Sequence, residues 1–205
     1  YGYANPEFTA SYNGFKNGQD LASSGITGVP SLTTAATETS AAGQYVITAQ
    51  GGTLAASNYS FSYTNGTLTI GKATITVTAD NKSRIYGDAN PAFTASYNGF
   101  RNGQDLASSG ISGSPSLTTL AVSTTGVGQY PIVSAIGTLS SANYDFAFAE
   151  GKLTIGKATI TITAEDKSRI YGDANPVFTA TYNGFKNGQD LSGSGISGTP
   201  SLTTV

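Results

Sequence analysis

The sequence predicts a mainly β protein built as a tandem array of small β domains. The same residues recur at a fixed spacing along the chain, short segments alternate apolar and polar side chains, and Gly, Asn and Asp separate those segments. Alternation with a period of two is typical of half-buried strands, and Gly, Asn and Asp favour turns. Repetition over tens of residues indicates tandem units rather than one large domain.

The repeat is defined by three Tyr-Gly anchors. Tyr1-Gly2, Tyr86-Gly87 and Tyr171-Gly172 lie 85 residues apart (86 − 1 and 171 − 86). Other groups recur at this offset without a gap: Gln44-Tyr45 at Gln129-Tyr130, Asn58-Tyr59 at Asn143-Tyr144, and Gly71-Lys72-Ala73 at Gly156-Lys157-Ala158. The differences between the first two copies concentrate in the second half of the repeat.

Side-chain parity predicts where one copy ends and the next begins, because successive strand residues face opposite sides. Leu153 and Ile155 share one parity and Ile160 and Ile162 the other, so the phase changes at Gly156-Lys157. The same change occurs at Gly71-Lys72. One strand therefore closes a domain and another opens the next, with no flexible Gly/Ser or Pro-rich linker.

This division gives three units. Residues 72–156 form a complete repeat, residues 1–71 lack the first strand of a repeat, and residues 157–205 lack its second half. Because the chain has no Met and begins inside the repeated pattern, we expect it to be an excerpt from a longer protein. Domains joined so tightly are expected to form an elongated rod.

Five segments of the complete repeat are expected to be strands: "ATITVTA" (73–79), "PAFTASY" (91–97), "PSLTT" (115–119), "QYPIVSA" (129–135) and "YDFAFAEGKLTI" (144–155). In the second of these, Phe93, Ala95 and Tyr97 should face inward. Pro131 has no N–H to donate, so its strand is expected at a sheet edge. A period-two aromatic stripe favours a core role over a sugar platform; it comprises Tyr144, Phe146 and Phe148, with Tyr59, Phe61 and Tyr63 in the first copy.

One motif occurs three times, as "NGFKNGQDL" (13–21), "NGFRNGQDL" (98–106) and "NGFKNGQDL" (183–191). Asn13-Gly14 supplies the positive φ for a chain reversal after a strand. In "QDLASSG", Asp20 should begin a single helical turn that Leu21 anchors to the core and Gly25 ends. A ligand-gripping loop is the alternative, but the motif has neither the Lys-Ser/Thr nor the spaced Gly triplet of a phosphate cradle.

The stretch "KATITVTADNKSRIYGDANPAFTASYNGF", followed by "GQY", "NY" and "GKLTI", resembles the MBG domains of the YGX type, and the resemblance covers the whole chain. Such domains occur in tandem in very large bacterial secreted and surface proteins. The resemblance implies a small β domain of an adhesin-like protein, with an immunoglobulin-like sandwich or a β-grasp-like fold, and for some relatives a mucin-binding role. A β-grasp fold would need a longer helix than "NGQDLASS" provides. The first copy departs from the pattern, because Tyr3 replaces the Asp of the Tyr-Gly-Asp signature.

Composition excludes several partners. Charged residues make up 11% of the chain, against about 25% in typical domains, and the net charge is −2 with no Lys/Arg cluster. We therefore expect no nucleic acid partner. The apolar runs are far shorter than the ~20 residues that span a bilayer, so we expect no membrane insertion. The absence of Cys excludes disulfides and suits a secreted or cell-surface bacterial protein.

Catalytic and metal chemistry have few candidates. The chain has no His, and the carboxylates that recur in all three copies are those of Asp20, Asp105 and Asp190. General acid–base catalysis draws on His or paired carboxylates, so we expect neither an enzyme nor a cofactor. The candidates for calcium are Asp80, Asp88, Asp166 and Asp173. Their spacing is not that of an EF-hand, so we expect a solvated surface and no metal.

The sequence therefore predicts a stalk or spacer repeat of a bacterial adhesin or extracellular fibre, whose partners are neighbouring repeats or copies of itself. The alternative is an adhesive module that binds host or matrix glycan or protein through the variable half of each repeat. Because residues 1–71 lack a counterpart of Ala73–Ala79, a β strand from outside is expected near Phe8–Tyr12 or Pro200–Val205. It would come from a continuing array or fibre, or from strand exchange between molecules.

Overall fold

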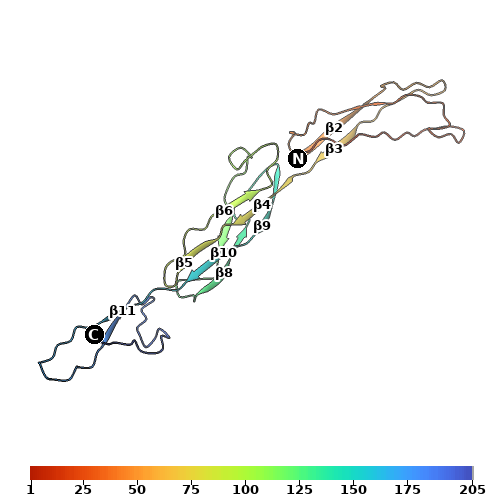
Figure 1. The fold of residues 1–205 in the computed structure, drawn as a ribbon. Coiled ribbons are helices and arrows are strands. Elements are labelled where there is room, and N and C mark those ends of the chain that lie inside the picture. Colours follow the sequence, from red (N-terminus) through yellow and green to blue (C-terminus); the bar gives the residue numbers. More distant parts are fainter. Residues whose placement is uncertain (205) are drawn as a thin grey trace. The chain divides into compact units, whose positions relative to one another are not determined.

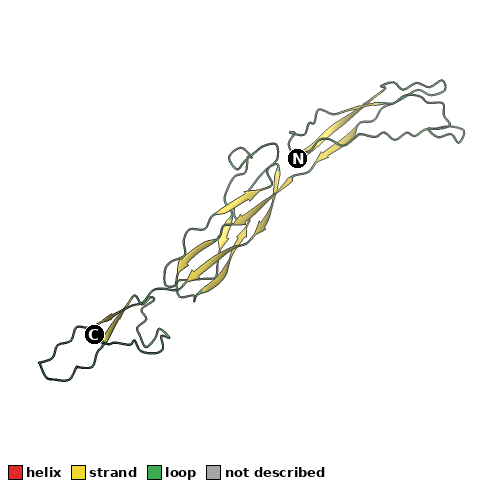
Figure 2. Ribbon diagram, viewed as in Figure 1, coloured by secondary structure: helices red, strands yellow, loops and turns green. Residues whose placement is uncertain are grey.

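The computed structural model describes residues 1–204, which form strands, turns and loops without a helix (Figures 1 and 2). The strands are β1 (Ser31–Thr33), β2 (Gly43–Gln50), β3 (Gly66–Ile70), β4 (Ala73–Ala79), β5 (Lys82–Ile85), β6 (Ala95–Asn98), β7 (Ser116–Thr118), β8 (Gly128–Ala135), β9 (Tyr144–Ala149), β10 (Gly151–Gly156), β11 (Thr161–Ala164) and β12 (Ala180–Asn183). The all-β prediction is confirmed. A β-grasp fold requires a helix, and residues 1–204 contain none. The immunoglobulin-like sandwich stays a prediction.

The chain divides into two compact units. The first comprises Tyr1–Thr76, Tyr97–Ser114 and Ile136–Ala147, and the second comprises Val77–Ser96, Pro115–Ala135 and the residues from Phe148 onward. Below, first, second and third repeat denote residues 1–71, 72–156 and 157–205; these boundaries remain predictions from the repeat pattern. Val205, in the expected docking segment Pro200–Val205, lies outside the described residues.

The first repeat contains one antiparallel sheet in the order β1-β2-β3. Its register pairs Ser31 with Gln50 on one side of β2 and Gly43 with Ile70 on the other. Leu68 of β3 is buried, whereas most other apolar residues of this sheet are only half-buried. The first repeat is therefore less well covered than the second.

The second repeat contains a sheet with the order β5-β10-β8-β7. β10 pairs in parallel with β5 and antiparallel with β8. The buried core beside this sheet consists of Ala79, Ala121, Ile132, Leu153 and Ile155. Four partly buried residues pack against this core: Tyr86, Phe93, Leu117 and Tyr130. Alternation along β10 puts Leu153 and Ile155 on this face, as the sequence predicts.

β4 is the middle strand of a second sheet with the order β6-β4-β9 (Figure 1). Its four odd-numbered residues, Ala73, Ile75, Val77 and Ala79, are all buried, which confirms the strand predicted for 73–79. Gly71-Lys72 separates β3 from β4, and the two strands belong to different sheets. The change of side-chain parity at this step therefore coincides with a change of sheet.

The third repeat contributes β11 and β12, which pair antiparallel with Thr161 opposite Asn183. All four residues of β11 are exposed, in contrast to the buried alternate residues of β4. β11 and the matching part of β4 carry nearly the same sequence, so the difference in burial comes from the neighbours of each strand and not from its composition.

Two predicted strands and the predicted aromatic stripe need correction. The segment 144–155 is two strands, β9 and β10, which separate at Glu150 and enter different sheets. The segment 91–97 is a strand only from Ala95, although Phe93, Ala95 and Tyr97 are on the more buried side as predicted. The aromatic stripe is core only in part, because Tyr144 is buried whereas Phe148 and Tyr63 are exposed.

Pro131 does not mark an edge strand, because β8 lies between β10 and β7. β7 is short and pairs with β8 only from Val133 to Ala135. Pro131 pairs with Lys152 of β10 and lies beyond the end of β7. The missing N–H is tolerated because the β7 side of the strand is open at this residue.

The repeated turn motif folds the same way in each copy. Asn17 and Gly18 both have positive φ, and Gln19 N donates to Lys16 O at 3.0 Å, so the tight reversal lies at this second Asn-Gly pair. Of the first pair, only Gly14 has a positive φ. Gly25 also has the predicted left-handed conformation.

The expected anchor of this motif is wrong. Leu21 is exposed, and Ser24 is buried instead with its hydroxyl donating to Leu21 O at 3.0 Å. The segment is a turn rather than a helical turn. A small hydroxyl side chain that satisfies the turn's own carbonyl can be buried where a leucine would not fit.

Candidate functional site: the junctions between repeats

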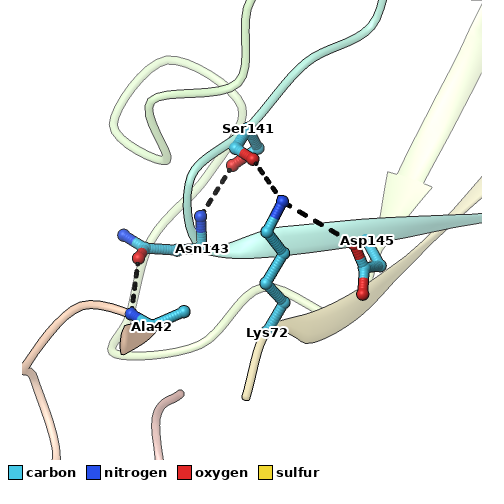
Figure 3. Close-up of polar contacts among 5 residues, drawn as sticks. All are labelled: Ala42, Lys72, Ser141, Asn143 and Asp145. Atoms are coloured by element: carbon cyan, nitrogen blue, oxygen red, sulfur yellow. Dashed lines mark hydrogen bonds and ion pairs between the residues drawn. The ribbon is translucent and has the colours of Figure 1, made fainter. Parts of the chain in front are cut away.

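The junction between the first two repeats begins at Lys72 (Figure 3). Its ammonium group donates to Ser141 O at 2.9 Å and lies 3.8 Å from Asp145 Oδ1. Both groups of the ion pair are well exposed, so the charge attraction adds little stability. The hydrogen bond ties the connection between repeats to the segment that leads into β9.

Asn143 links the two repeats through its side chain (Figure 3). Its Oδ1 accepts a hydrogen bond from Ala42 N of the first repeat at 3.0 Å. Its backbone oxygen accepts from Ala73 N, the first residue of β4, at 3.0 Å. One asparagine thus holds a loop of the first repeat and the opening strand of the second.

Aromatic rings form the centre of this junction. Tyr1 of the first repeat meets Tyr144 of the second edge-on, with ring centroids 5.5 Å apart. Gln104 Oε1 accepts hydrogen bonds from both hydroxyls, at 3.1 Å from Tyr1 and 2.7 Å from Tyr144. The Tyr144 hydroxyl in turn accepts from Arg101 N at 3.0 Å. Edge-on aromatic pairs contribute about 0.5–1.5 kcal/mol beyond their buried area.

Gly2, Tyr3 and Arg101 form a second contact at this junction. The guanidinium carbon of Arg101 lies 4.4 Å from the Tyr3 ring centroid, which is a cation–π contact. The stem of Arg101 lies against Gly2, where an added Cβ would be 2.4 Å from Arg101 Cβ. Gly2 also has φ of +78°, so both the close approach and the backbone require glycine.

The junction between the second and third repeats uses the same positions with different chemistry. Lys186 Nζ lies 2.9 Å from Asp88 Oδ1, at the positions that Arg101 and Tyr3 occupy in the preceding junction. An added Cβ on Gly87 would be 2.3 Å from Lys186 Cβ. Each junction therefore places the stem of a basic side chain on the glycine of a Tyr-Gly anchor, and its charged head on the next residue.

Backbone contacts within each repeat recur beside both junctions. Tyr1 N donates to Gly71 O at 2.7 Å, and Tyr86 N donates to Gly156 O at 2.8 Å. The following glycines donate to equivalent loop residues at the same distance, Gly2 to Glu38 O and Gly87 to Ser123 O at 3.2 Å. Asn187 Nδ2 of the third repeat adds a hydrogen bond to Ser123 O at 3.3 Å. The junction is thus a repeated structure.

The acidic residues considered for calcium are dispersed. Asp88 pairs with Lys186, and Asp80 accepts a hydrogen bond from Thr94 Oγ1. Asp173 takes part through its backbone, whose oxygen accepts from Arg169 at 3.1 Å, and Asp166 is exposed. Within residues 1–204, no group of three or more His, Cys, Asp or Glu side chains is arranged to hold a metal ion.

The recurring turn aspartates stabilise their own loops. Asp105 Oδ1 accepts from Ser108 N at 2.8 Å and from Ser108 Oγ at 2.6 Å, and Asp20 makes the same bonds to Ser23. Asp190 accepts from Ser192 Oγ and Gly193 N. These hydrogen bonds, from the serine hydroxyl first and the backbone second, lower the pKa of all three carboxyl groups. The carboxylates are therefore held ionised by their turns.

Sequence reasoning missed the side chains that meet at the junctions. It noted that Tyr3 replaces the Asp of the signature and that the turn motif has Arg101 in one copy and Lys186 in another, but it did not connect the two changes. Asp88 and Lys186 are 98 residues apart, as are Tyr3 and Arg101. The joint change from Tyr–Arg to Asp–Lys is the signal in the sequence that could have paired them.

Comparisons with known proteins agree with the repeat. The family model described as MBG domain (YGX type) matches residues 1–69, 75–154 and 160–204. No curated protein and no solved structure matches the chain. No helix within residues 1–204 has the length and apolar character needed to cross a membrane.

Proposed function

We propose, from the premise that this chain belongs to the MBG domain (YGX type) family as three tandem copies, that it is a structural spacer. In this role the repeats run end to end as an elongated rod, forming the stalk of a secreted or cell-surface bacterial adhesin or an extracellular fibre. The observation that carries the proposal is that at both junctions a basic side chain of one repeat lies on the glycine of the preceding repeat's Tyr-Gly anchor, beside the same backbone contacts.

The connection between repeats supports a stiff spacer. β3 ends at Ile70 and β4 begins at Ala73, so Gly71 and Lys72 are the whole connection. Lys72 is hydrogen-bonded to Ser141, and Asn143 holds Ala42. A linker of two residues with bonds on either side restricts the angle between repeats more than a flexible linker does.

Composition supports an extracellular location. The chain has no Cys and 11% charged residues, and domains of its family are typical of surface proteins. A surface rich in hydroxyl groups and low in net charge has no footprint for nucleic acid. The partners in this proposal are neighbouring repeats or copies of the chain, without cofactor or metal.

We also propose that the chain is not an enzyme. His and Cys are absent, and each recurring carboxylate is engaged by its own turn. Polysaccharide and peptide hydrolysis assays test this proposal, with no turnover expected. Turnover that is lost in Asp105→Asn would contradict it.

An adhesive module is the second candidate, and one observation favours it. The variable half of the second repeat exposes large aliphatic side chains, Leu120 fully, at positions where the first repeat has smaller or polar ones. The exposed residues are Leu120, Val122, Val127 and Val133, and their counterparts are Ala35, Thr37, Ala42 and Thr48. In this reading the second repeat binds glycan or protein of a host or matrix.

Substitution of these exposed side chains separates the two roles. A variant with Leu120→Ser and Val122→Thr should keep the fold, because both residues point to solvent. The spacer role predicts unchanged behaviour, including unchanged retention on immobilised mucin. A saturable interaction with mucin that this variant abolishes would favour the adhesive role instead.

A further inference from the structure

Asn-Gly pairs occur seven times in the chain, and three of them lie in the tight turns of the repeated motif. A glycine that follows asparagine leaves the side-chain amide open to attack by the main-chain nitrogen, because glycine has no Cβ to block the approach. In each of the three turns both residues have a positive φ. The three pairs are Asn17-Gly18, Asn102-Gly103 and Asn187-Gly188.

Asn102-Gly103 lies between two residues that hold the first repeat. The guanidinium group of Arg101 lies on the Tyr3 ring, and Gln104 accepts a hydrogen bond from the Tyr1 hydroxyl at 3.1 Å. The turn itself is closed by one hydrogen bond, from Gln104 N to Arg101 O at 3.0 Å. The length of the main chain through this turn therefore determines how both side chains reach the first repeat.

The groups that would react in this turn are free. Asn102 and Gly103 are exposed, and an added Cβ on Gly103 would have nothing within 4 Å. Within residues 1–204, neither the Asn102 side chain nor Gly103 N makes a hydrogen bond, and the same holds for Asn17 and Gly18. Opening of one exposed turn is enough to bring the glycine nitrogen to the side-chain carbonyl, and exposed turns are among the parts of a fold that open most easily.

We propose that Asn102 is a site of spontaneous deamidation, and that the isoaspartate formed there releases the contacts between the first and second repeats. Gly103 N loses its proton and attacks Asn102 Cγ, and ammonia leaves from the side-chain amide, which gives a five-membered succinimide. Water then opens the ring at Cγ to give aspartate, or at the main-chain carbonyl carbon to give isoaspartate. One amide and one water become one carboxylate and one ammonium ion, without an oxidant or a reductant. The inference does not depend on the spacer role.

The two products differ in their effect on the turn. Aspartate leaves the main chain unchanged and tolerates the left-handed conformation. In isoaspartate the main chain runs through Cβ and Cγ and is one atom longer. A two-residue turn with positive φ at both Asn102 and Gly103 does not accommodate this extra atom. Arg101 and Gln104 then lose the spacing that their contacts with the first repeat require.

The equivalent asparagine at the second junction is better protected. Asn187 Nδ2 donates to Ser123 O at 3.3 Å, so its side chain must give up a hydrogen bond before it reacts. We therefore expect Asn187 to react more slowly than Asn102. Its aspartate product would place an acceptor against Ser123 O in place of a donor, so at this junction either product removes a contact.

Two other Asn-Gly pairs serve as references within the same chain. Asn65 Oδ1 accepts a hydrogen bond from Ala49 N at 3.2 Å, and Gly66 is the first residue of β3. Asn98 is the last residue of β6. At both pairs the attack would disturb the end of a paired strand, which opens less easily than an exposed turn.

Peptide mapping of the full chain during incubation at mildly alkaline pH tests the site. Base favours the reaction because the attacking main-chain nitrogen must lose its proton. Mass spectrometry with electron-transfer fragmentation identifies isoaspartate at each position. We expect conversion first at Asn17 and Asn102 and later at Asn187, whereas Asn65 and Asn98 should convert last. Conversion at Asn102 that is no faster than at Asn65 or Asn98 would overturn the proposal.

The release of the junction has its own reporter. The Ala42 amide donates to Asn143 Oδ1 across the junction, so its hydrogen exchange measures whether the contact persists. Exchange at Ala42 should become faster in chains that carry isoaspartate at residue 102. Unchanged exchange in those chains would contradict the release of the contacts.

Two variants separate the covalent change from other effects of incubation. Asn102→Gly removes the side-chain amide and keeps a residue that adopts positive φ without strain, so exchange at Ala42 should stay slow after incubation. Asn102→Asp matches the aspartate product and should leave exchange at Ala42 unchanged before incubation. If Ala42 loses protection as fast in Asn102→Gly as in the parent chain, a different change opens the junction and the proposal is overturned.

Discussion

Lys186 Nζ lies 2.9 Å from Asp88 Oδ1 across the junction of the second and third repeats, at the positions held by Arg101 and Tyr3 one repeat earlier. The pairs differ in chemistry, a salt bridge in one case and a cation–π contact in the other, but share their place on the fold. Each basic side chain also covers the glycine of a Tyr-Gly anchor. The residue after the Tyr-Gly anchor of one repeat is therefore matched by the basic residue in the turn motif of the next repeat.

Exchange of the two charges tests this pairing. Lys186→Asp alone should destabilise the junction, because two carboxylates then face each other, and Asp88→Lys with Lys186→Asp should restore most of the loss. For a partly exposed pair we expect a coupling of about 0.2–1 kcal/mol that weakens with added salt. A double-mutant cycle from urea unfolding measures it; a double change whose effect equals the sum of the two single changes would show that the pair is not coupled.

Glycine at the junction can be tested with a matched control. Gly87→Ala introduces a Cβ about 2.3 Å from Lys186 Cβ, in addition to the strain of φ at +88°. Gly172→Ala has φ of +90° with nothing within 4 Å, so it bears the backbone cost of about 1–2 kcal/mol without the collision. We expect Gly87→Ala to lower the free energy of unfolding more than Gly172→Ala. Equal losses would mean that Lys186 moves aside without cost.

A second matched pair lies in the repeat itself. Gly151→Ala would place a Cβ 2.3 Å from Ala79 O, a backbone atom of β4, and overpacking of this kind costs about 1–3 kcal/mol. Gly66→Ala at the equivalent position of the first repeat has only ordinary contacts and should cost far less. Thermal unfolding of dilute samples compares the two variants. A similar loss in both would show that β4 does not impose the requirement for glycine.

Most strands are predictable because their cause is local. Ile75 and Val77 alternate with threonines, and the structure buries the apolar pair as expected. Asn17 and Gly18 form a tight turn that depends on their own backbone preferences. Sequence reasoning was wrong where neighbouring segments determine burial and pairing. Leu21 is exposed although it is apolar, and Pro131 is tolerated in an inner strand because β7 is too short to reach it.

The junction was less predictable because it depends on contacts about a hundred residues apart. The change of parity at Gly71-Lys72 indicates where the sheets change, but not that Tyr1 packs on Tyr144 or that Arg101 lies on Gly2. Lys186 lies on Gly87 at the next junction with the same separation along the chain, 99 residues (186 − 87 and 101 − 2). Residues of one repeat acquire partners in the next only once the relative position of the two is known.

The turn carboxylates predict a specific response to acid. Hydrogen bonds from Ser108 hold the pKa of Asp105 below 3.8 in the folded chain, so its contribution to stability is fully present above the unfolded pKa. That contribution is lost as the pH falls through the lowered folded value. The difference in unfolding free energy between the parent and Asp105→Asn should therefore be constant near neutral pH and shrink below about pH 4. Urea titrations at several pH values measure it, and a difference that grows in acid would contradict the assignment.

Small-angle X-ray scattering of the chain, at concentrations where it is a single copy, tests the spacer proposal most directly. A compact protein of 205 residues has a radius of gyration of about 17 Å. The spacer proposal predicts a clearly larger radius of gyration and a distance distribution with a long tail, because in a rod repeats of about 30–45 Å would follow one another end to end. Insertion of Gly-Ser residues after Gly156 should broaden that distribution. A symmetric distribution with a radius of gyration near 17 Å would contradict the proposal.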